Sequence, residues 1–317
     1  MPSLKVIRKR ITTVKSTQKI TRAMKMVAGA RLARAQARIT ALRPYAVKTQ
    51  EMLRSVADSV RTTAEEQVDD GVGTEEEVLH PLLKVRPEKK VLYLVLSGDR
   101  GLCGAFNANV NKTVEREWRA KLETLGSAEE AFVEFATAGK KGRDYLTRRG
   151  AKIEHEFAVY DGLDLAKSRQ VSDYVVSRFR KGEIDSVYVI YNQFKSAITQ
   201  KVVVERLLPL ERPVVSAEGE SDAVAAANAQ KTSFLFEPNP KALLERLVPM
   251  YIETAIYRAL LDSQASEFGA RMTAMDAATR NAKDMIGRLT LVYNRARQAA
   301  ITKELMEIIG GAEALKE

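Results

Sequence analysis

Two long stretches at the ends of the chain carry apolar residues at alternating spacings of three and four. The first runs from Leu4 to Val60, and thirteen of its seventeen seam positions are apolar. This heptad pattern predicts a coiled-coil helix of about eight heptads, roughly 90 Å long. Pro44 lies inside the pattern. Because the pattern resumes after it, we expect a kink there rather than the end of the helix.

The second stretch follows the stop signal formed by Pro238 and Pro240, and its seam extends from Leu243 to Met306. It predicts a helix of about 70 residues, or roughly 105 Å. Such lengths exceed what a globular core requires. The sequence therefore predicts that the two terminal segments pair as an antiparallel coiled coil.

Each seam has a polar gap, and the two gaps suggest a register. The first gap holds Gln18, Thr21 and Lys25, and the second runs from Gln264 to Arg271. If the gaps lie side by side in antiparallel helices, the numbers of two residues that face each other sum to about 290. A cysteine pair introduced at Met24 and Arg271 is then expected to cross-link. Roughly the last thirty residues then lack a partner. Because they are apolar on several sides, we expect another protein to bury them.

Between the long helices, strand-like and helix-like segments alternate. This alternation predicts a Rossmann-like, largely parallel sheet covered by helices. The expected strands are 91–97, 132–138, 152–159, 186–191 and 201–208, and the expected helices are 109–125, 140–149 and 164–181.

The predicted division of the chain has five parts: a coiled-coil helix (1–61), an acidic loop (62–87), the α/β domain (88–212), a linker loop (213–238) and a second coiled-coil helix (239–317). Residues 62–80 contain seven acidic side chains and no basic one, and residues 216–231 are rich in Ala, Ser, Gly and Asn. Such compositions predict solvated insertions.

The net charge of +10 is concentrated in the first helix. The first fifty residues contain no Asp or Glu and thirteen basic residues: Lys5, Arg8, Lys9, Arg10, Lys15, Lys19, Arg22, Lys25, Arg31, Arg34, Arg38, Arg43 and Lys48. Solvated coiled coils usually mix charges to gain i,i+4 pairs, so a face of one sign indicates an acidic partner. An Arg-rich, acid-poor start is also typical of a mitochondrial presequence, but the heptad pattern continues past the usual length of one.

Candidate catalytic chemistry is sparse. One cysteine and two histidines argue against a disulfide framework and a Cys- or His-rich metal site. The turn Gly98–Gly104 could cradle a phosphate, but it matches neither the dinucleotide fingerprint nor the Walker loop. His155 is expected at the surface, and Cys103 is expected to be a small packing residue. We therefore expect no catalytic residue, no cofactor and no metal in this chain.

Three separated segments resemble the gamma subunit of F-type ATP synthases, in its bacterial form. They are Thr17–Ala28 (TQKITRAMKMVA), Ser97–Gly104 (SGDRGLCG), and the C-terminal pair Ala270–Met275 (ARMTAM) and Asn294–Leu305 (NRARQAAITKEL). The resemblance covers nearly the whole chain. It implies the central-stalk rotor, a non-catalytic subunit that couples transmembrane proton or sodium flow to ATP synthesis or hydrolysis.

The resemblance also implies partners and contact residues. The partners are the alpha and beta subunits of the catalytic head, the epsilon subunit and the c-ring, at the cytoplasmic face of a bacterial plasma membrane. Met24 and Arg271 are expected to face the acidic lever loop of a beta subunit. Contacts with beta are also expected near the top of the shaft, at Arg297, Gln298 and Thr302, and along an ionic track that includes Arg31 and Arg34.

The alternative is a basic coiled-coil protein that binds nucleic acid, with an α/β module. A basic face can follow phosphates, but single-strand binding usually needs interleaved aromatic residues, and Tyr45 is the one aromatic in the first fifty positions. No nucleic acid is therefore expected as a partner.

Overall fold

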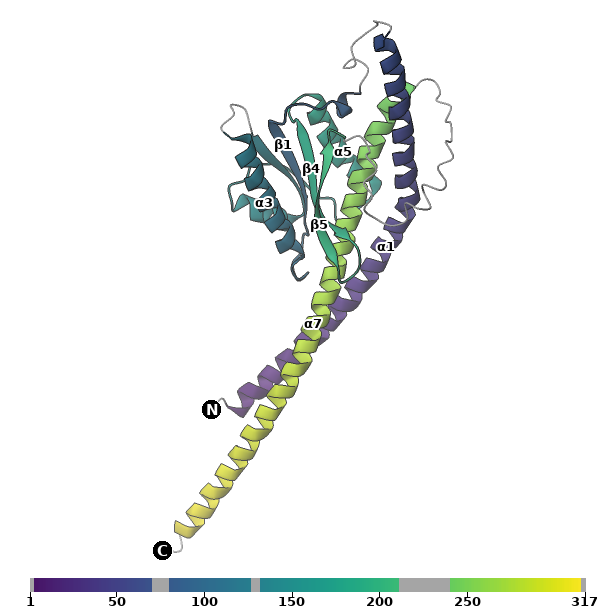
Figure 1. Cartoon of the computed structure of the whole chain (residues 1–317). Coiled ribbons are helices and arrows are strands. Elements are labelled where there is room, and N and C mark those ends of the chain that lie inside the picture. Colours follow the sequence, from purple (N-terminus) through teal and green to yellow (C-terminus); the bar gives the residue numbers. More distant parts are fainter. Residues whose placement is uncertain (1–2, 70–79, 127–131, 211–239, 315–317) are drawn as a thin grey trace.

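Two long helices and a five-stranded sheet make up the molecule (Figure 1). The computed structural model describes residues 3–69, 80–126, 132–210 and 240–314. Helix α1 (Leu4–Asp69) and helix α7 (Pro240–Ala314) run side by side in opposite directions, and the central segment packs beside their upper part (Figure 1). The predicted fold class is confirmed: an antiparallel two-helix coiled coil with a central α/β domain.

Small and branched apolar side chains join the two long helices, which together form the shaft. Leu32 and Ala35 of α1 form a buried cluster with Ala265 of α7, and Leu53 and Val56 enter the main core farther up. Small side chains at a helix contact allow the two axes to approach closely. Both helices continue through an internal proline, Pro44 in α1 and Pro249 in α7.

The predicted register of the shaft is wrong by about ten residues. The hydroxyls of Thr21 and Thr279 are 2.8 Å apart, and Lys25 Nζ lies 2.5 Å from Asp276 Oδ1. Paired residue numbers therefore sum to about 300. The polar gap of α1 is matched by Asp276 and Thr279, because the polar stretch 264–271 of α7 serves a different contact, with the α/β domain.

This register also shortens the unpartnered end of α7. Leu4 lies at the level of about residue 296, so α7 extends beyond α1 from about residue 297 to its end at Ala314, and not from about residue 286 as expected. Residues 301–311 are all exposed. Figure 1 shows this end of α7 projecting alone past the N-terminus of α1.

The sheet has the strand order β3-β2-β1-β4-β5. Its members are β1 (Lys90–Leu96), β2 (Phe132–Ala138), β3 (Ile153–Phe157), β4 (Ser186–Phe194) and β5 (Gln200–Leu208). The first four are parallel, and β5 pairs antiparallel with β4 at the edge. The prediction of a largely parallel sheet is confirmed.

Helices cover both faces of the sheet. Helix α3 (Phe106–Leu125) and helix α4 (Lys140–Thr147) cover one face, while α5 (Leu165–Arg180) and the two long helices cover the other. Strand β1 supplies both layers: Leu92, Leu94 and Leu96 face the long helices, and Val91, Tyr93 and Val95 face α3. A strand buried on both faces is a nearly continuous apolar run, as its sequence shows.

The expected loops differ from the structure at one point. Helix α1 continues to Asp69, so residues 62–69 are helical and not part of an acidic loop. The stretch is Thr-Thr-Ala-Glu-Glu-Gln-Val-Asp, and its Ala, Glu and Gln residues favour helix. Residues 70–79 and 216–231 lie outside the described residues. A short 3₁₀ helix, η1 (Pro81–Leu83), leads into β1. His155 is exposed on β3, as predicted, and stacks on Tyr174.

Candidate functional site: the exposed surfaces of the shaft

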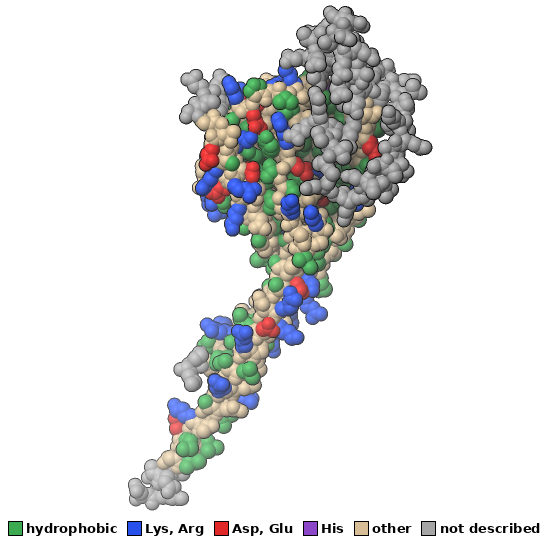
Figure 2. Space-filling view, in the orientation of Figure 1, with side chains coloured by type: hydrophobic (Ala, Val, Ile, Leu, Met, Phe, Trp, Pro, Cys, Tyr) green, Lys and Arg blue, Asp and Glu red, His purple; other side chains and the backbone are tan. Residues whose placement is uncertain are grey.

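The lower shaft carries a basic surface, formed by α1 and visible in Figure 2. Lys5, Arg8, Lys9, Arg10, Lys15, Lys19 and Arg22 are all exposed. Among the described residues, Lys25 and Lys48 are the two cations of the first fifty positions that form ion pairs, with Asp276 and Glu51. The remaining charge faces solvent and can attract an acidic surface.

The end of α7 is an apolar tip. Beyond the level of Leu4 it exposes the large side chains of Ile301, Leu305, Met306, Ile308 and Ile309, and Met285, Leu291 and Val292 are exposed just before that level, where α7 still lies beside α1. Scattered exposed apolar residues are normal, but a helix that exposes this many along one end is typical of a segment buried in a partner.

The expected contact residues occupy three places on the shaft. Arg297, Gln298 and Thr302 are exposed on the tip. Arg31 and Arg34 are exposed on α1, where the Arg31 guanidinium lies 5.9 Å from the centre of the Phe268 ring. The structure thus leaves all five accessible to a partner.

Met24 and Arg271 are not brought together. In the observed register Met24 lies near Asp276, and Arg271 lies near Gly29. The Arg271 side chain is only 11% exposed and turns toward the α/β domain, where Nη2 donates to the carbonyl of Gly101 at 3.3 Å. Nη2 also donates to Oε1 of Glu267, one turn earlier on α7, at 2.5 Å. Sequence reasoning missed Glu267. The sequence does contain an indication of it, because a polar run inside the apolar seam of α7 indicates a second contact surface on that helix.

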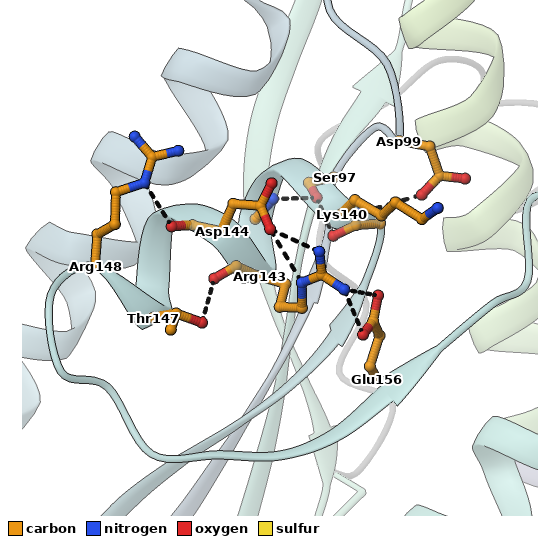
Figure 3. A network of polar contacts seen from close by, with 10 residues as sticks. Ser97, Asp99, Lys140, Arg143, Asp144, Thr147, Arg148 and Glu156 are labelled. Atoms are coloured by element: carbon orange, nitrogen blue, oxygen red, sulfur yellow. Dashed lines mark hydrogen bonds and ion pairs between the residues drawn. The ribbon is translucent and has the colours of Figure 1, made fainter.

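The carboxylate of Asp99 occupies the N-terminus of helix α4, where an anion could otherwise bind. The N-terminus of a helix that follows a strand is a common site for phosphate. At the start of α4, however, Lys140 N donates to Asp99 Oδ1 at 3.1 Å, and Gly142 N donates to Ser97 Oγ at 2.8 Å (Figure 3). Gly139 has φ +106, and a Cβ there would lie 2.1 Å from Ser97 O, so only glycine permits this close approach.

A second network in Figure 3 fixes the same helix to the sheet. Arg143 Nη1 donates to both carboxylate oxygens of Glu156 on β3, at 2.9 and 2.8 Å. Its Nη2 donates to Asp144 at 2.7 Å. These are surface pairs that orient α4, and they engage the guanidinium of Arg143. Within the described residues, no group of His, Cys, Asp or Glu side chains is arranged to hold a metal ion.

Comparison with known proteins decides the family. A family model described as ATP synthase matches residues 3–315. A relative from Sorangium cellulosum, described as an ATP synthase gamma chain, is 56% identical over 328 aligned residues and covers 100% of both chains. The chain belongs to the ATP synthase gamma chain family. Another gamma chain, from Pelotomaculum thermopropionicum, is 44% identical with the same full coverage.

Solved structures share the fold of this gamma chain. A chain from the Euglena gracilis mitochondrial ATP synthase (OSCP/F1/c-ring, rotational state 3) has a TM-score of 0.61 at 17% identity and covers 98% of this chain and 94% of its own. A chain from the central stalk and c-ring of the Tetrahymena thermophila enzyme has a TM-score of 0.56 at 22% identity, with 82% and 99% covered. Across the described part of the gamma chain, no helix is both long and apolar enough to cross a membrane.

Proposed function

We propose that this chain is the central-stalk rotor of an F-type ATP synthase. It couples proton or sodium flow through the membrane to ATP synthesis or hydrolysis, and it has no catalytic site of its own. The observation that carries the proposal is the shape of the shaft: a two-helix coil whose longer member ends in an exposed apolar tip. An exposed apolar surface of this kind marks a site that a partner buries.

The partners follow from the same surfaces. The tip and the basic surface of α1 fit the inside of a ring of alpha and beta subunits, with Arg297, Gln298 and Thr302 at the tip and Arg31 and Arg34 along the side. The α/β domain then lies at the other end, beside the epsilon subunit and the c-ring at the membrane. Met24 and Arg271 remain proposed contacts of the beta lever loop, although Arg271 is largely covered by its own chain.

A reconstitution experiment tests the proposal. The full chain is mixed with alpha and beta subunits of its own complex, and ATPase activity and rotation of the shaft are measured. We expect an active, rotating assembly. Failure to assemble, together with salt-dependent retention of duplex DNA, would instead support the nucleic-acid alternative.

Charge reversal on α1 sharpens the test. The double variant R31E/R34E places two acidic side chains where the beta lever loops are expected, so it should lower coupled proton pumping at least about tenfold by like-charge repulsion. The matched control is R116E/R119E on α3, which has the same spacing and is exposed outside the shaft. Equal pumping by both variants would count against the ionic track.

A further inference from the structure

The polar stretch of α7 lies across the carboxyl ends of β1 and β4. Ser266 Oγ donates to the carbonyl of Asn192 in β4 at 3.0 Å, and Ser263 Oγ donates to the carbonyl of Leu96 in β1 at 3.5 Å. In an open α/β sheet with this strand order, the crevice between these two strands is where a ligand normally binds. Here a helix of the same chain occupies it.

Glu267 and Arg271 form a largely buried charge pair in this contact. Their side chains are 10% and 11% exposed, and they are 2.5 Å apart. Arg271 Nη2 also lies 3.3 Å from the carbonyl of Gly101 and 3.5 Å from that of Arg100, to which it donates. Burial raises the pKa of the Glu267 carboxyl, and Arg271 opposes that rise. A buried charge pair of this kind is strongly destabilised when one partner is removed.

The pair holds a turn that is strained on its own. In the turn 98–104, Leu102 has φ +64, a conformation that costs an ordinary residue of order 1–3 kcal/mol and persists only when its surroundings impose it. A Cβ on Gly98 would lie 3.0 Å from the Glu267 carboxyl carbon, so this carboxylate packs directly on the turn. Asn107 braces the turn from the other side, accepting from Gly98 N at 2.9 Å.

These contacts lie where α7 leaves the α/β domain (Figure 1). On the neighbouring hairpin between β4 and β5, Ala197 O accepts from Thr273 Oγ1 at 3.2 Å. The α/β domain therefore contacts α7 on two sides within the same stretch of the helix, between residues 263 and 273. Below that level the shaft is a two-helix coil alone.

We propose that Glu267 and Arg271 are positioning residues that latch turn 98–104 to α7, so that the α/β domain and the shaft turn as one body. The latch itself is a property of the isolated chain. Its role in transmitting rotation rests on the proposed function, and the two parts have separate tests.

The single cysteine of the chain reports on the latch. Cys103 lies in the turn and is 2% exposed, so a maleimide reaches it only when the turn opens. In the isolated full-length chain, the variants E267Q and R271Q are each expected to accelerate labelling of Cys103 at least about tenfold. Each variant removes a charge-assisted hydrogen bond that keeps the turn closed, so the open state becomes more populated. The control is R280Q, which removes an i,i+4 partner of Asp276 on the exposed face of the same helix.

Electrostatics alone predicts a different result. Burial is the main cause that raises the pKa of the Cys103 thiol; the Glu267 carboxylate raises it further, and Arg271 lowers it. Without a latch, E267Q would therefore speed labelling and R271Q would slow it. Acceleration by both variants supports the latch, and opposite effects or no effect overturn it. The double variant E267Q/R271Q leaves no lone buried charge, so it remains informative if a single variant fails to fold.

The second part is tested in the assembled ATP synthase. E267Q, at a residue with no proposed contact to beta, is expected to lower the number of protons pumped per ATP hydrolysed at least about twofold while hydrolysis continues, and R280Q is expected to leave that ratio unchanged. An unchanged ratio, in an E267Q chain whose Cys103 labels faster, overturns the transmission role and leaves the latch standing. If the unaltered chain fails to assemble at all, the proposed function fails and the labelling result still decides the latch.

Discussion

Asp262 is a carboxylate held inside the contact between α7 and the sheet, where it is 8% exposed. Burial raises its pKa to about 6; Arg258 opposes this rise, and Glu205 adds to it. The folded chain thus holds this proton more tightly than the unfolded chain, in which the pKa is 3.8. The stabilising contribution is fully present below about pH 4 and is lost as the pH rises through about 6.

Replacing Asp262 with Asn removes this dependence. We expect D262N to match the wild type near pH 4 and to exceed its free energy of unfolding at pH 8 by up to about 3 kcal/mol, from roughly two pKa units at 1.36 kcal/mol each. Urea unfolding at the two pH values measures the difference. D276N is a control of opposite sign, because Lys25 lowers the pKa of Asp276 and stabilises its charged form. A D262N chain that is equally destabilised at both pH values would contradict this account.

At the scale of elements, the register of the shaft rests on two polar pairs, Thr21 with Thr279 and Lys25 with Asp276. In a Cys103→Ser background, the pair T21C/T279C is expected to form a disulfide under mild oxidation, because the two hydroxyls it replaces are 2.8 Å apart. The pair M24C/R271C serves as the comparison and is expected to stay reduced. Mobility of the oxidised chain on a denaturing gel distinguishes the two. Preferential cross-linking of M24C/R271C would restore the register expected from the polar gaps.

The elements themselves could be predicted from the sequence, while their register could not. The continuous apolar run 91–96 predicts a strand buried on both faces, and the expected strands and helices agree with the structure to within a few residues. A heptad seam, however, fits nearly as well after a slip that carries one seam position onto another, such as the ten residues (steps of three, four and three) here, so only its polar positions distinguish one register from another. Within 264–271, Ser266 and Arg271 contact the α/β domain while Ala265 and Phe268 pack on α1, and no local pattern tells which neighbour a residue faces.

The contact residues divide in the same way. The exposure of Arg297, Gln298 and Thr302 on the tip follows from a helix that is longer than its partner, which the sequence already indicates. The burial of Arg271 could not be predicted from the sequence, because it depends on the turn 98–104, some 170 positions away. Glu267 is predictable only as a polar residue in an apolar seam. Its carboxylate acquires a role from the fold and not from its local sequence.

At the scale of the whole molecule, the apolar tip is exposed in the free chain and is expected to contribute nothing to its stability. The triple variant I301Q/L305Q/I308Q is expected to leave the urea midpoint of the isolated chain unchanged, since all three side chains are exposed there. It should weaken assembly with alpha and beta subunits at least about tenfold, because burying each large apolar side chain is worth about 1.5–3 kcal/mol. Assembly is measured by size-exclusion chromatography and ATPase activity.

The control for the tip removes equal apolar surface elsewhere. Leu122, Leu165 and Ile198 are exposed on the α/β domain, and L122Q/L165Q/I198Q should leave assembly at the wild-type level. If the tip variant lowered the stability of the isolated chain, the tip would have a partner within its own chain. If both triple variants assembled like the wild type, the tip would not be the buried end of the shaft.

The pairing of Thr21 with Thr279 joins positions 258 residues apart, so the two helices of the shaft are synthesised at very different times. The ribosome releases α1 first and α7 last, so a basic amphipathic helix waits without its partner while the whole α/β domain is made. The crevice of the sheet also stays open until residues 263–271 emerge. A chain that stops before Pro240 has neither a shaft nor a closed domain, so the last quarter of the polypeptide completes both at once.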